Sequence, residues 1–321
     1  MRINHLKYLV DPISKKLFRL KIQKKVGDHI IEGWLECATR RYKIHQGIPR
    51  ILADSQYHNP SFRNHQAHTA DSFSFEWNQI YTENNYERSN YLHFLSPFIT
   101  ANSIPGKVIL DAGCGSGRFT KQAALLKAKL VIGFDLGGTV TKAYDLTHHL
   151  SNTLIVQADI YTPPFLNMFD LVHSIGVLHH LPQPQLGFKS LIGCIKPGGK
   201  ILIWVYNRRK NLRALYFYEP LRNISRHLPK PLLYKLCYFP ASIVHLINLS
   251  TKKWTNPPFG YYRNFPFNMK LNDAFDVLAT PKSNYYYWEE IEDWFHEAGL
   301  KNIKHFEHPE AGITCIGSYD Q

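Results

Sequence analysis

Val-Ile-Leu-Asp-Ala-Gly-Cys-Gly-Ser-Gly-Arg-Phe-Thr, residues 108–120, is the stretch that decides the fold of this chain. An apolar run ends at Asp111, and Gly113, Gly115 and Gly117 follow at alternate positions before a helical pattern begins. Glycines so spaced let the backbone turn tightly and let a ligand approach without interference from Cβ atoms. A strand that passes through such a turn into a helix is the nucleotide-binding corner of an open α/β sheet.

The glycine spacing separates two classes of cofactor. A dinucleotide fingerprint, Gly-x-Gly-x-x-Gly, would need glycine at position 118, where this chain has Arg118. The observed Asp-x-Gly-x-Gly-x-Gly resembles the first motif of class I methyltransferases, which use S-adenosylmethionine. In that family the loop passes the amino-acid end of a ligand that has no pyrophosphate. For the motif alone, the alternative is a glycine turn that binds nothing.

Two more strand-like runs end in acids. Residues 130–135 end at Asp135, which lies 18 positions after Gly117, close to the offset of a ribose-binding carboxylate. A carboxylate can accept two hydrogen bonds from a ribose diol. Residues 154–160 contain Asp159, and the resemblance implies that this acid accepts a hydrogen bond from the adenine amino group. The resemblance implies a cofactor-binding set of Asp111, Gly113, Gly115, Gly117, Asp135, Leu136, Asp159, Ile160 and Ser174.

The remaining pattern completes a sheet. Residues 169–181 indicate a fourth strand with its following loop, and a Lys-Pro-Gly-Gly turn at 196–199 precedes a fifth strand at 200–206. Residues 288–298 form a helical stripe, and two short strands follow near 302–305 and 312–318. The order is similar to that of the seven-stranded methyltransferase sheet, whose last strand inserts antiparallel.

We therefore predict an α/β fold: a Rossmann-like, seven-stranded, mostly parallel sheet with helices on both faces, a small N-terminal β-rich ribbon-like domain and a helical insert. The predicted division is a ribbon-like domain at 1–52, a linker and aromatic segment at 53–84, a methyltransferase domain at 85–206 and 285–321, and a basic aromatic insert at 207–284.

The first 52 residues resemble a small zinc-ribbon domain, found alone as an activator of tRNA and protein methyltransferases and also fused ahead of bacterial ones. Two Cys-x-x-Cys-type pairs of that domain correspond here to Asp11 with Ser14 and to Cys37 with Arg40. Structural zinc needs four thiolate or imidazole ligands. One cysteine of four remains, so we expect no metal and a structural or partner-docking role.

The segment 71–81 is dense in aromatic residues, among them Phe73, Phe75 and Trp77. In many class I methyltransferases such a segment folds over the cofactor as a lid. The alternative is that the three rings cap the hydrophobic core. The sequence leaves both interpretations open.

His179 and His180 follow the fourth predicted strand and are the candidate catalytic residues. Methyl transfer from a sulfonium needs a base only where the acceptor must lose a proton, and imidazole can accept one near neutral pH. The alternative is that one histidine caps a helix and the other packs under the sheet edge. Tyr261, Tyr262 and Tyr285–Tyr287 are further candidates for the acceptor pocket, because of their position after the insert.

Composition is that of a globular protein: 321 residues, 44% hydrophobic and 20% charged. The first residues show no signal-peptide pattern, and no run of 18 uninterrupted apolar residues occurs. The five cysteines are odd in number and unpaired in spacing, which suits a reducing compartment. These observations predict a cytoplasmic protein.

The net charge of +13 is unevenly distributed. Residues 1–52 carry 12 basic and 4 acidic groups, and residues 207–264 carry 11 basic groups and one acid, Glu219. Three interpretations of 207–264 stay open: a solvated helical cover, peripheral contact with an anionic membrane or acidic amphiphile, and contact with RNA phosphates. Of these, nucleic acid is the least favoured.

One motif match is set aside. Asn-Pro-Pro-Phe at 256–259 spells the motif with which adenine amino-methyltransferases hold their target nitrogen. In those enzymes the motif directly follows the fourth strand, whereas here it stands about 80 residues further on. A rigid surface turn accounts for the two prolines.

Taken together, the resemblance implies an enzyme that transfers a methyl group from S-adenosylmethionine to oxygen or carbon of a small-molecule, glycan or lipid-linked acceptor. The alternatives are an RNA methyltransferase and a catalytically silent cofactor-binding or docking protein.

Overall fold

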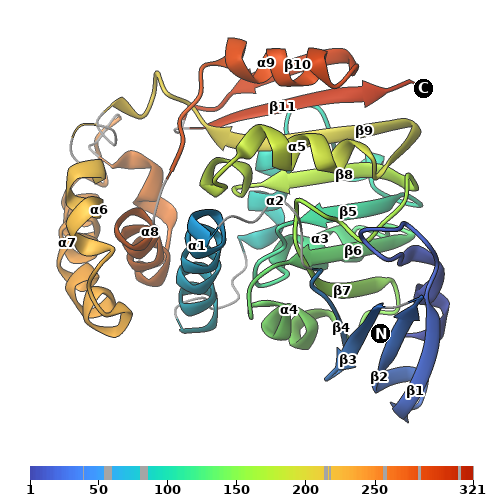
Figure 1. Cartoon of the computed structure of the whole chain (residues 1–321). Coiled ribbons are helices and arrows are strands. Elements are labelled where there is room, and N and C mark those ends of the chain that lie inside the picture. Colours follow the sequence, from blue (N-terminus) through green and yellow to red (C-terminus); the bar gives the residue numbers. More distant parts are fainter. Residues whose placement is uncertain are drawn as a thin grey trace.

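The computed structural model describes residues 1–38, 40–53, 60–79, 86–212, 216, 218–255, 259–280, 283–309 and 312–320. These residues form one 11-stranded sheet in the order β1-β2-β3-β4-β7-β6-β5-β8-β9-β11-β10 (Figure 1). The strands are β1 (Arg19–Val26), β2 (His29–Cys37), β3 (Arg40–His45), β4 (Ile48–Ile51), β5 (Val108–Ala112), β6 (Leu130–Asp135), β7 (Thr153–Ala158), β8 (Phe169–Ile175), β9 (Ile195–Tyr206), β10 (Lys301–Glu307) and β11 (Gly312–Tyr319).

The seven strands from β7 to β10 confirm the predicted Rossmann-like sheet. Strands β7, β6, β5, β8 and β9 run parallel, and β11 inserts antiparallel to β9, with Thr314 opposite Trp204. Residues of β5, β6 and β7 are almost all buried, as expected of parallel strands covered on both faces. The carboxyl ends of the parallel strands therefore meet at one edge.

Helices cover both faces of this sheet. On one face, α2 (Glu87–Leu95) and α3 (Arg118–Leu125) share a hydrophobic cluster with β5 and β8. On the other, α5 (Pro184–Ile192) and α9 (Trp288–Glu297) pack through Phe188 and Phe295. Helix α4 (Val140–Thr147) packs beside β7.

The N-terminal strands continue the same sheet. Strands β1 to β4 pair antiparallel in sequence order, and β4 then joins β7 in parallel, with Ile51 opposite Ala158. Leu35 and Ile44 belong to the same hydrophobic cluster as Leu154 of the central sheet. A free-standing zinc ribbon is therefore not confirmed, because this region shares its hydrophobic core with the rest of the molecule.

The four positions that correspond to ribbon cysteines come together around a buried carboxylate. Ser14 Oγ donates to Asp11 Oδ2 over 2.7 Å, Arg40 Nη1 lies 3.6 Å from the same oxygen, and Tyr42 donates to Asp11 Oδ1 over 2.9 Å. Cys37 Sγ lies 3.8 Å from Ser14 Oγ. Burial alone would raise the pKa of Asp11, but hydrogen bonds from Ser14 and Tyr42 and the charge of Arg40 lower it overall.

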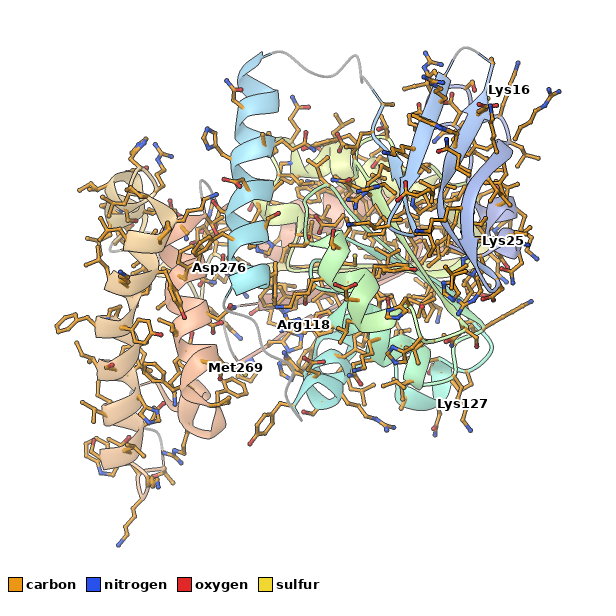
Figure 2. The ribbon with its side chains drawn as sticks, turned by 90° about the horizontal axis from the view of Figure 1, so that it is seen from below. Lys16, Lys25, Arg118, Lys127, Met269 and Asp276 are labelled. Carbon is orange, nitrogen blue, oxygen red and sulfur yellow. The ribbon has the colours of Figure 1, made fainter. Side chains whose placement is uncertain are left out.

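A separate layer of helices faces the carboxyl edge of the sheet. It consists of α6 (Glu219–Ser225), α7 (Lys230–Ser250) and α8 (Phe267–Ala279), and α1 (Pro60–Gln79) stands between this layer and the sheet (Figure 1). Leu233 and Cys237 of α7 pack on Leu271 and Phe275 of α8. Figure 2 shows α7 at the outer edge of the molecule, with α8 on its inner side. The sheet edge and this layer enclose the site described next.

Candidate functional site

The glycine loop after β5 has a backbone conformation that residues with a side chain rarely adopt. Gly113 and Gly117 both have φ of +80°, in the left-handed region. A Cβ on Gly113 would lie 2.4 Å from a methyl group of Val177, and one on Gly117 would lie 2.8 Å from the Cβ of Ala143. The loop is therefore packed against its neighbours on one side, and Gly113 and Gly115 line a cavity on the other.

Asp135 at the end of β6 is held by the same loop. Its Oδ2 accepts a hydrogen bond from the Gly115 N–H over 3.0 Å, and its Oδ1 accepts one from the Gly137 N–H over 2.9 Å. Burial raises the pKa of Asp135, and these backbone hydrogen bonds oppose the rise. A carboxylate oriented in this way at a strand end can accept hydrogen bonds from a diol.

A cavity of about 130 Å³ lies between the glycine loop, the ends of β6 and β7, and helix α1. Five residues of the predicted cofactor set line it: Gly113, Gly115, Asp135, Leu136 and Ile160. Their backbone groups and side chains form a cradle beside a carboxylate, which suits the adenosyl part of S-adenosylmethionine. The structure thus brings the centre of the predicted set together.

The other four predicted residues lie outside this lining and support it. Asp111 Oδ2 accepts a hydrogen bond from Thr120 over 2.6 Å, and Ser174 Oγ donates to the Ala112 carbonyl over 3.0 Å. Asp159 accepts from Gln66 over 2.9 Å, and Gln66 itself lines the cavity. Gly117 begins α3. Direct contact of these four residues with a cofactor stays a prediction.

The three aromatic residues of α1 do not all have the same role. The sequence left open whether they cover the cofactor or cap the hydrophobic core, and the structure shows both arrangements. Phe73 and Trp77 line the cavity, and the Arg118 guanidinium lies 4.9 Å from the centre of the Trp77 ring. Phe75 packs instead against Phe275 of α8, with ring centres 5.3 Å apart. Two of the three rings therefore cover the cleft, and the third caps a hydrophobic cluster.

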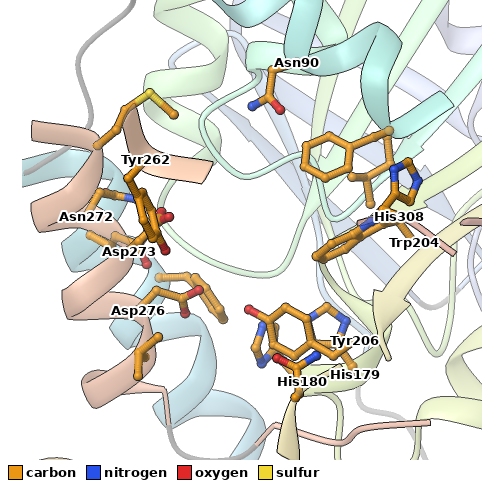
Figure 3. A pocket seen from close by; sticks show the side chains of 18 of the residues that line it. Asn90, His179, His180, Trp204, Tyr206, Tyr262, Asn272, Asp273, Asp276 and His308 are labelled. Carbon is orange, nitrogen blue, oxygen red and sulfur yellow. The ribbon is translucent and has the colours of Figure 1, made fainter. Parts of the chain in front are cut away.

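A second and larger cavity, of about 520 Å³, adjoins the first. Figure 3 shows Asn272, Asp273 and Asp276 of α8 on one wall and the rings of Trp204 and Tyr206 on the other. Six residues line both cavities: Phe73, Trp77, Arg118, Ile175, Gly176 and His180. The two cavities therefore adjoin at these residues.

Three carboxyl groups, those of Glu76, Asp273 and Asp276, lie together on the α8 side of this cavity. Burial and the neighbouring charge of Asp276 raise the pKa of Asp273 to about 7, against a hydrogen bond from Tyr262. Glu76 of α1 faces the same wall, and burial raises its pKa well above the ordinary value, as do both aspartates. Asn272 Nδ2 donates to Glu76 Oε1 over 2.6 Å. Nothing in the sequence pattern of residues 267–279 indicated this cluster, because its members come from two helices.

The two candidate histidines lie on η3, a 3₁₀ helix at Leu178–His180, and have different surroundings. His180 lines both cavities and lies 3.3 Å from Ser283 Oγ. His179 lines only the larger one, and burial lowers its pKa well below the ordinary value. The Asn284 N–H and side chain both donate to the His179 carbonyl, which fixes this turn.

The remaining predicted positions lie partly inside and partly outside the larger cavity. Of the five tyrosines predicted for the acceptor pocket, Tyr262 and Tyr285 line the larger cavity. Tyr286 and Tyr287 do not line it, and Tyr286 packs instead on Trp294 with ring centres 4.9 Å apart. The side chain of Tyr261 lies outside the described part of the chain. Residues 256–258 of the Asn-Pro-Pro-Phe motif lie outside the described residues. Arg222 of α6, which the sequence analysis did not single out as a site residue, also lines the cavity and is held by Glu219 and by the Val277 carbonyl.

Comparison with known proteins supports the central part of this site. Residues 110–203 match the family model described as a methyltransferase domain. The chain is 30% identical over 111 residues to the ubiquinone biosynthesis O-methyltransferase of Pseudomonas putida F1, which covers 33% of this chain and 47% of that protein. It is 31% identical over 127 residues to the protein of the same name from Shewanella sp. ANA-3, covering 36% and 53%. The chain thus spans about half the length of these curated relatives.

Two solved structures show distant likeness. One is the magnesium protoporphyrin IX methyltransferase of Synechocystis PCC 6803 with bound SAH, 12% identical, with 79% of this chain and 97% of that chain covered and a TM-score of 0.49. Another is the complex between the Haloferax volcanii Trm112 methyltransferase activator and a putative methyltransferase, 13% identical, with 80% and 98% covered and a TM-score of 0.46. The sequence match, rather than these likenesses, is what relates residues 110–203 to methyltransferase domains.

Proposed function

We propose that this chain transfers a methyl group from S-adenosylmethionine to an oxygen or carbon atom of a small-molecule, glycan or lipid-linked acceptor. The observation that carries the proposal is that two cavities adjoin at the sheet edge. The smaller one is lined by the glycine loop and Asp135, and His180 lines both the smaller and the larger one. The matched methyltransferase domain spans both the loop and this junction.

Each part of the site has a role in this reaction. S-adenosylmethionine supplies a methyl group on a positively charged sulfur, which is a good leaving group. Asp135 and the loop orient the cofactor at the sheet edge, and Phe73 and Trp77 of α1 exclude water above it. The larger cavity would hold the acceptor beside the cofactor, and alignment of the two would supply most of the rate enhancement.

His180 is the residue that we propose as the base. Where the acceptor is a hydroxyl, its oxygen would bond to the methyl carbon as the methyl–sulfur bond breaks and S-adenosylhomocysteine leaves, and the hydroxyl proton would pass to the His180 ring. His179 is enclosed behind it, and burial keeps its ring neutral. We therefore propose a positioning role for His179, which packs on Tyr206 with ring centres 4.0 Å apart.

The larger cavity favours an acceptor that can both stack and donate hydrogen bonds. Trp204, Tyr206 and Tyr285 supply ring faces, and Asp273, Asp276 and Asn272 supply oxygen atoms. The name of the curated relatives, ubiquinone biosynthesis O-methyltransferase, favours oxygen over carbon as the acceptor atom. A cytoplasmic location completes the proposal.

The test is a methyl-labelling experiment on the whole chain. Purified protein and S-adenosylmethionine labelled in the methyl group are incubated with separated small-molecule, lipid and RNA fractions of cells. Label should enter the small-molecule or lipid fraction. His180→Gln should lower the rate about a hundredfold or more for a hydroxyl acceptor, whereas His149→Gln, at an exposed histidine, should leave it unchanged.

Three outcomes would overturn the proposal. Label that enters only RNA would establish the RNA methyltransferase alternative. Calorimetric binding of S-adenosylmethionine without label in any fraction would indicate a catalytically silent cofactor-binding or docking protein. Binding that is absent altogether would remove the cofactor assignment as well.

A further inference from the structure

Helix α7 is apolar on two opposite faces. Its inner face packs on α8 through Leu233, Cys237 and Ala241. Its outer face carries large exposed side chains at spacings of four, three, four and three residues, which places them on one line along the helix. These residues, the outer stripe, are Leu232, Leu236, Phe239, Ile243 and Leu246.

The exposure of this stripe is high. Phe239 is 75% exposed and Leu246 63%. On the neighbouring helix, Ile224 of α6 is 72% exposed and Leu221 54%, and Trp254 beyond the end of α7 is 58% exposed. Single exposed apolar residues are normal, but a contiguous series of this kind marks an interaction surface. Figure 2 shows that α7 is the outermost helix on this side, with its side chains pointing away from the rest of the molecule.

Positive charge flanks the stripe. Helix α7 contains no aspartate or glutamate, and Lys235 lies beside the stripe and is exposed. Lys252 and Lys253 follow the end of the helix and are exposed as well, as is Arg226 before its start. An apolar stripe with flanking lysines matches the chemistry of an anionic bilayer surface, whose interior takes up the apolar side chains while its headgroups attract the lysines.

We propose that the outer stripe of α7, with Leu221 and Ile224 of α6, docks this protein on an anionic lipid bilayer. The helix lies along the surface, with the stripe buried at the boundary between headgroups and acyl chains and the lysines at headgroup level. This contact does not depend on the methyl-transfer proposal, because none of the stripe residues lines either cavity.

A surface orientation follows from the packing of α7. Among the described helices, α7 is the one long and apolar enough to cross a membrane, by length and composition only. Its inner residues, however, pack on Leu271 and Phe275 of α8. Crossing the bilayer would expose that core, whereas lying on the surface keeps it intact.

Other occupants fit the surface less well. A second copy of the chain, related by two-fold symmetry, would bring the same lysine-flanked surface against itself, with no acid on α7 to pair with it. RNA would account for the lysines but would leave the apolar stripe in water. Of the three, the bilayer alone satisfies both the apolar and the charged part of the surface.

The test is vesicle co-sedimentation of the whole chain. We expect binding to vesicles of phosphatidylglycerol and phosphatidylcholine, at least tenfold weaker binding to phosphatidylcholine alone, and weakening by salt. Phe239→Glu with Leu246→Glu should reduce binding at least tenfold. The matched control, Val26→Glu, changes another exposed apolar residue (63% exposed) on β1 and should bind as the parent does.

Further measurements keep the result interpretable. Phe239→Trp retains an apolar side chain and should show a blue-shifted fluorescence component on adding anionic vesicles, which does not require the glutamate variants to fold. No binding to anionic vesicles by the parent, or equal binding by the double glutamate variant with an unchanged circular dichroism spectrum, would overturn the proposal. So would a stripe-dependent dimer in solution, or RNA binding that the glutamate pair leaves unchanged in place of vesicle binding.

Discussion

The two walls of the candidate site are built in different ways. The wall at the sheet edge consists of strand ends and one tight loop, and its contacts are largely backbone hydrogen bonds, such as those from Gly115 and Gly137 to Asp135. The opposite wall consists of side chains from α1, α6 and α8, segments that lie far apart in the sequence. The residues of the first wall can be predicted from their spacing in the sequence. The residues of the second wall come together only when the helices pack.

The difference extends to electrostatics. At the sheet edge Asp135 accepts backbone hydrogen bonds that oppose the effect of burial on its pKa. On the helical wall, Glu76, Asp273 and Asp276 face one another, and burial and mutual repulsion raise the pKa values of Glu76 and Asp273. We infer that Asp135 at the sheet edge is held in place to accept hydrogen bonds from a ligand. The protonation of Glu76 and Asp273 on the helical wall, by contrast, depends on the charges around them.

The largest effect is expected at the sheet edge, from Gly113→Val. A side chain there combines a left-handed φ of +80° with a Cβ 2.4 Å from Val177. The strain and the overlap should weaken cofactor binding roughly a hundredfold or more, measured by calorimetry. Gly106→Val is the matched control, because Gly106 has φ of +76° with no atom within 4 Å of an added Cβ. Equal cofactor affinity in the two variants would contradict the assignment of the loop.

Asp135→Asn tests the carboxylate at the same sheet edge. The amide keeps the shape of the side chain but cannot accept hydrogen bonds at both of its ends, so the contacts of the two backbone donors and of a ribose diol weaken. We expect about 2 kcal/mol of lost binding, roughly thirtyfold in the Kd for S-adenosylmethionine. Asp145→Asn, at an exposed position on α4, should bind as the parent does. An unchanged Kd for Asp135→Asn would place the ribose elsewhere.

The carboxyl groups of the helical wall should make the stability of the protein depend on pH. The pKa of Asp273 is about 7 in the folded protein against an ordinary value of 3.8, so the folded state holds a proton that the unfolded state releases. The free energy of unfolding should therefore fall as pH rises from about 4 to about 7. Asp273→Asn removes this loss and should be more stable than the parent by about 1–2 kcal/mol at pH 8, with little difference near pH 4.

The control for this pH experiment is Asp293→Asn, at an exposed position on α9, which should show the pH dependence of the parent. Chemical denaturation at both pH values measures the difference. A stability difference for Asp273→Asn that is the same at pH 4 and pH 8 would show that Asp273 ionises normally.

The smallest effect on stability is expected from Trp204→Phe. The Trp204 Nε1–H is buried without a hydrogen-bond partner among the described residues, and its ring packs edge-on against Phe94 at 5.1 Å. Phenylalanine keeps the ring contact, so the free energy of unfolding should change by less than about 1 kcal/mol. If Nε1 donates to the acceptor, the KM for that acceptor should rise about fivefold while the Kd for the cofactor stays constant. An unchanged KM would leave Trp204 a packing residue.

Sequence spacing predicted the sheet well, for a physical reason. Parallel strands buried on both faces must be short apolar runs, and the loop after β5 needs glycine where φ is positive, so both leave local marks in the sequence. The predicted strands near 302–305 and 312–318 correspond to β10 and β11. The sequence also placed Gly113, Gly115 and Asp135 at one site, since adjacent parallel strands end at one edge.

The resemblance of residues 1–52 to a zinc ribbon predicted their place in the fold less reliably. The pattern at positions 11, 14, 37 and 40 suggested a separate ribbon-like domain, and the structure does bring these positions together. Yet β4 pairs with β7, and the region shares the central core. Strand pairing across about 100 residues depends on tertiary packing and leaves no local periodicity to detect.

By itself, then, the sequence determined the order of strands and helices in the seven-stranded sheet, the glycine bend and the carboxylate that follows it, because each of these is a requirement of a few consecutive residues. Only the tertiary structure decided that Glu76, Asp273 and Asp276 share a cavity, that His180 rather than His179 stands at the junction of the two spaces, and that α7 turns a second apolar face outward. These properties arise from contacts between distant segments, and their energies depend on burial, which no single stretch of the chain specifies.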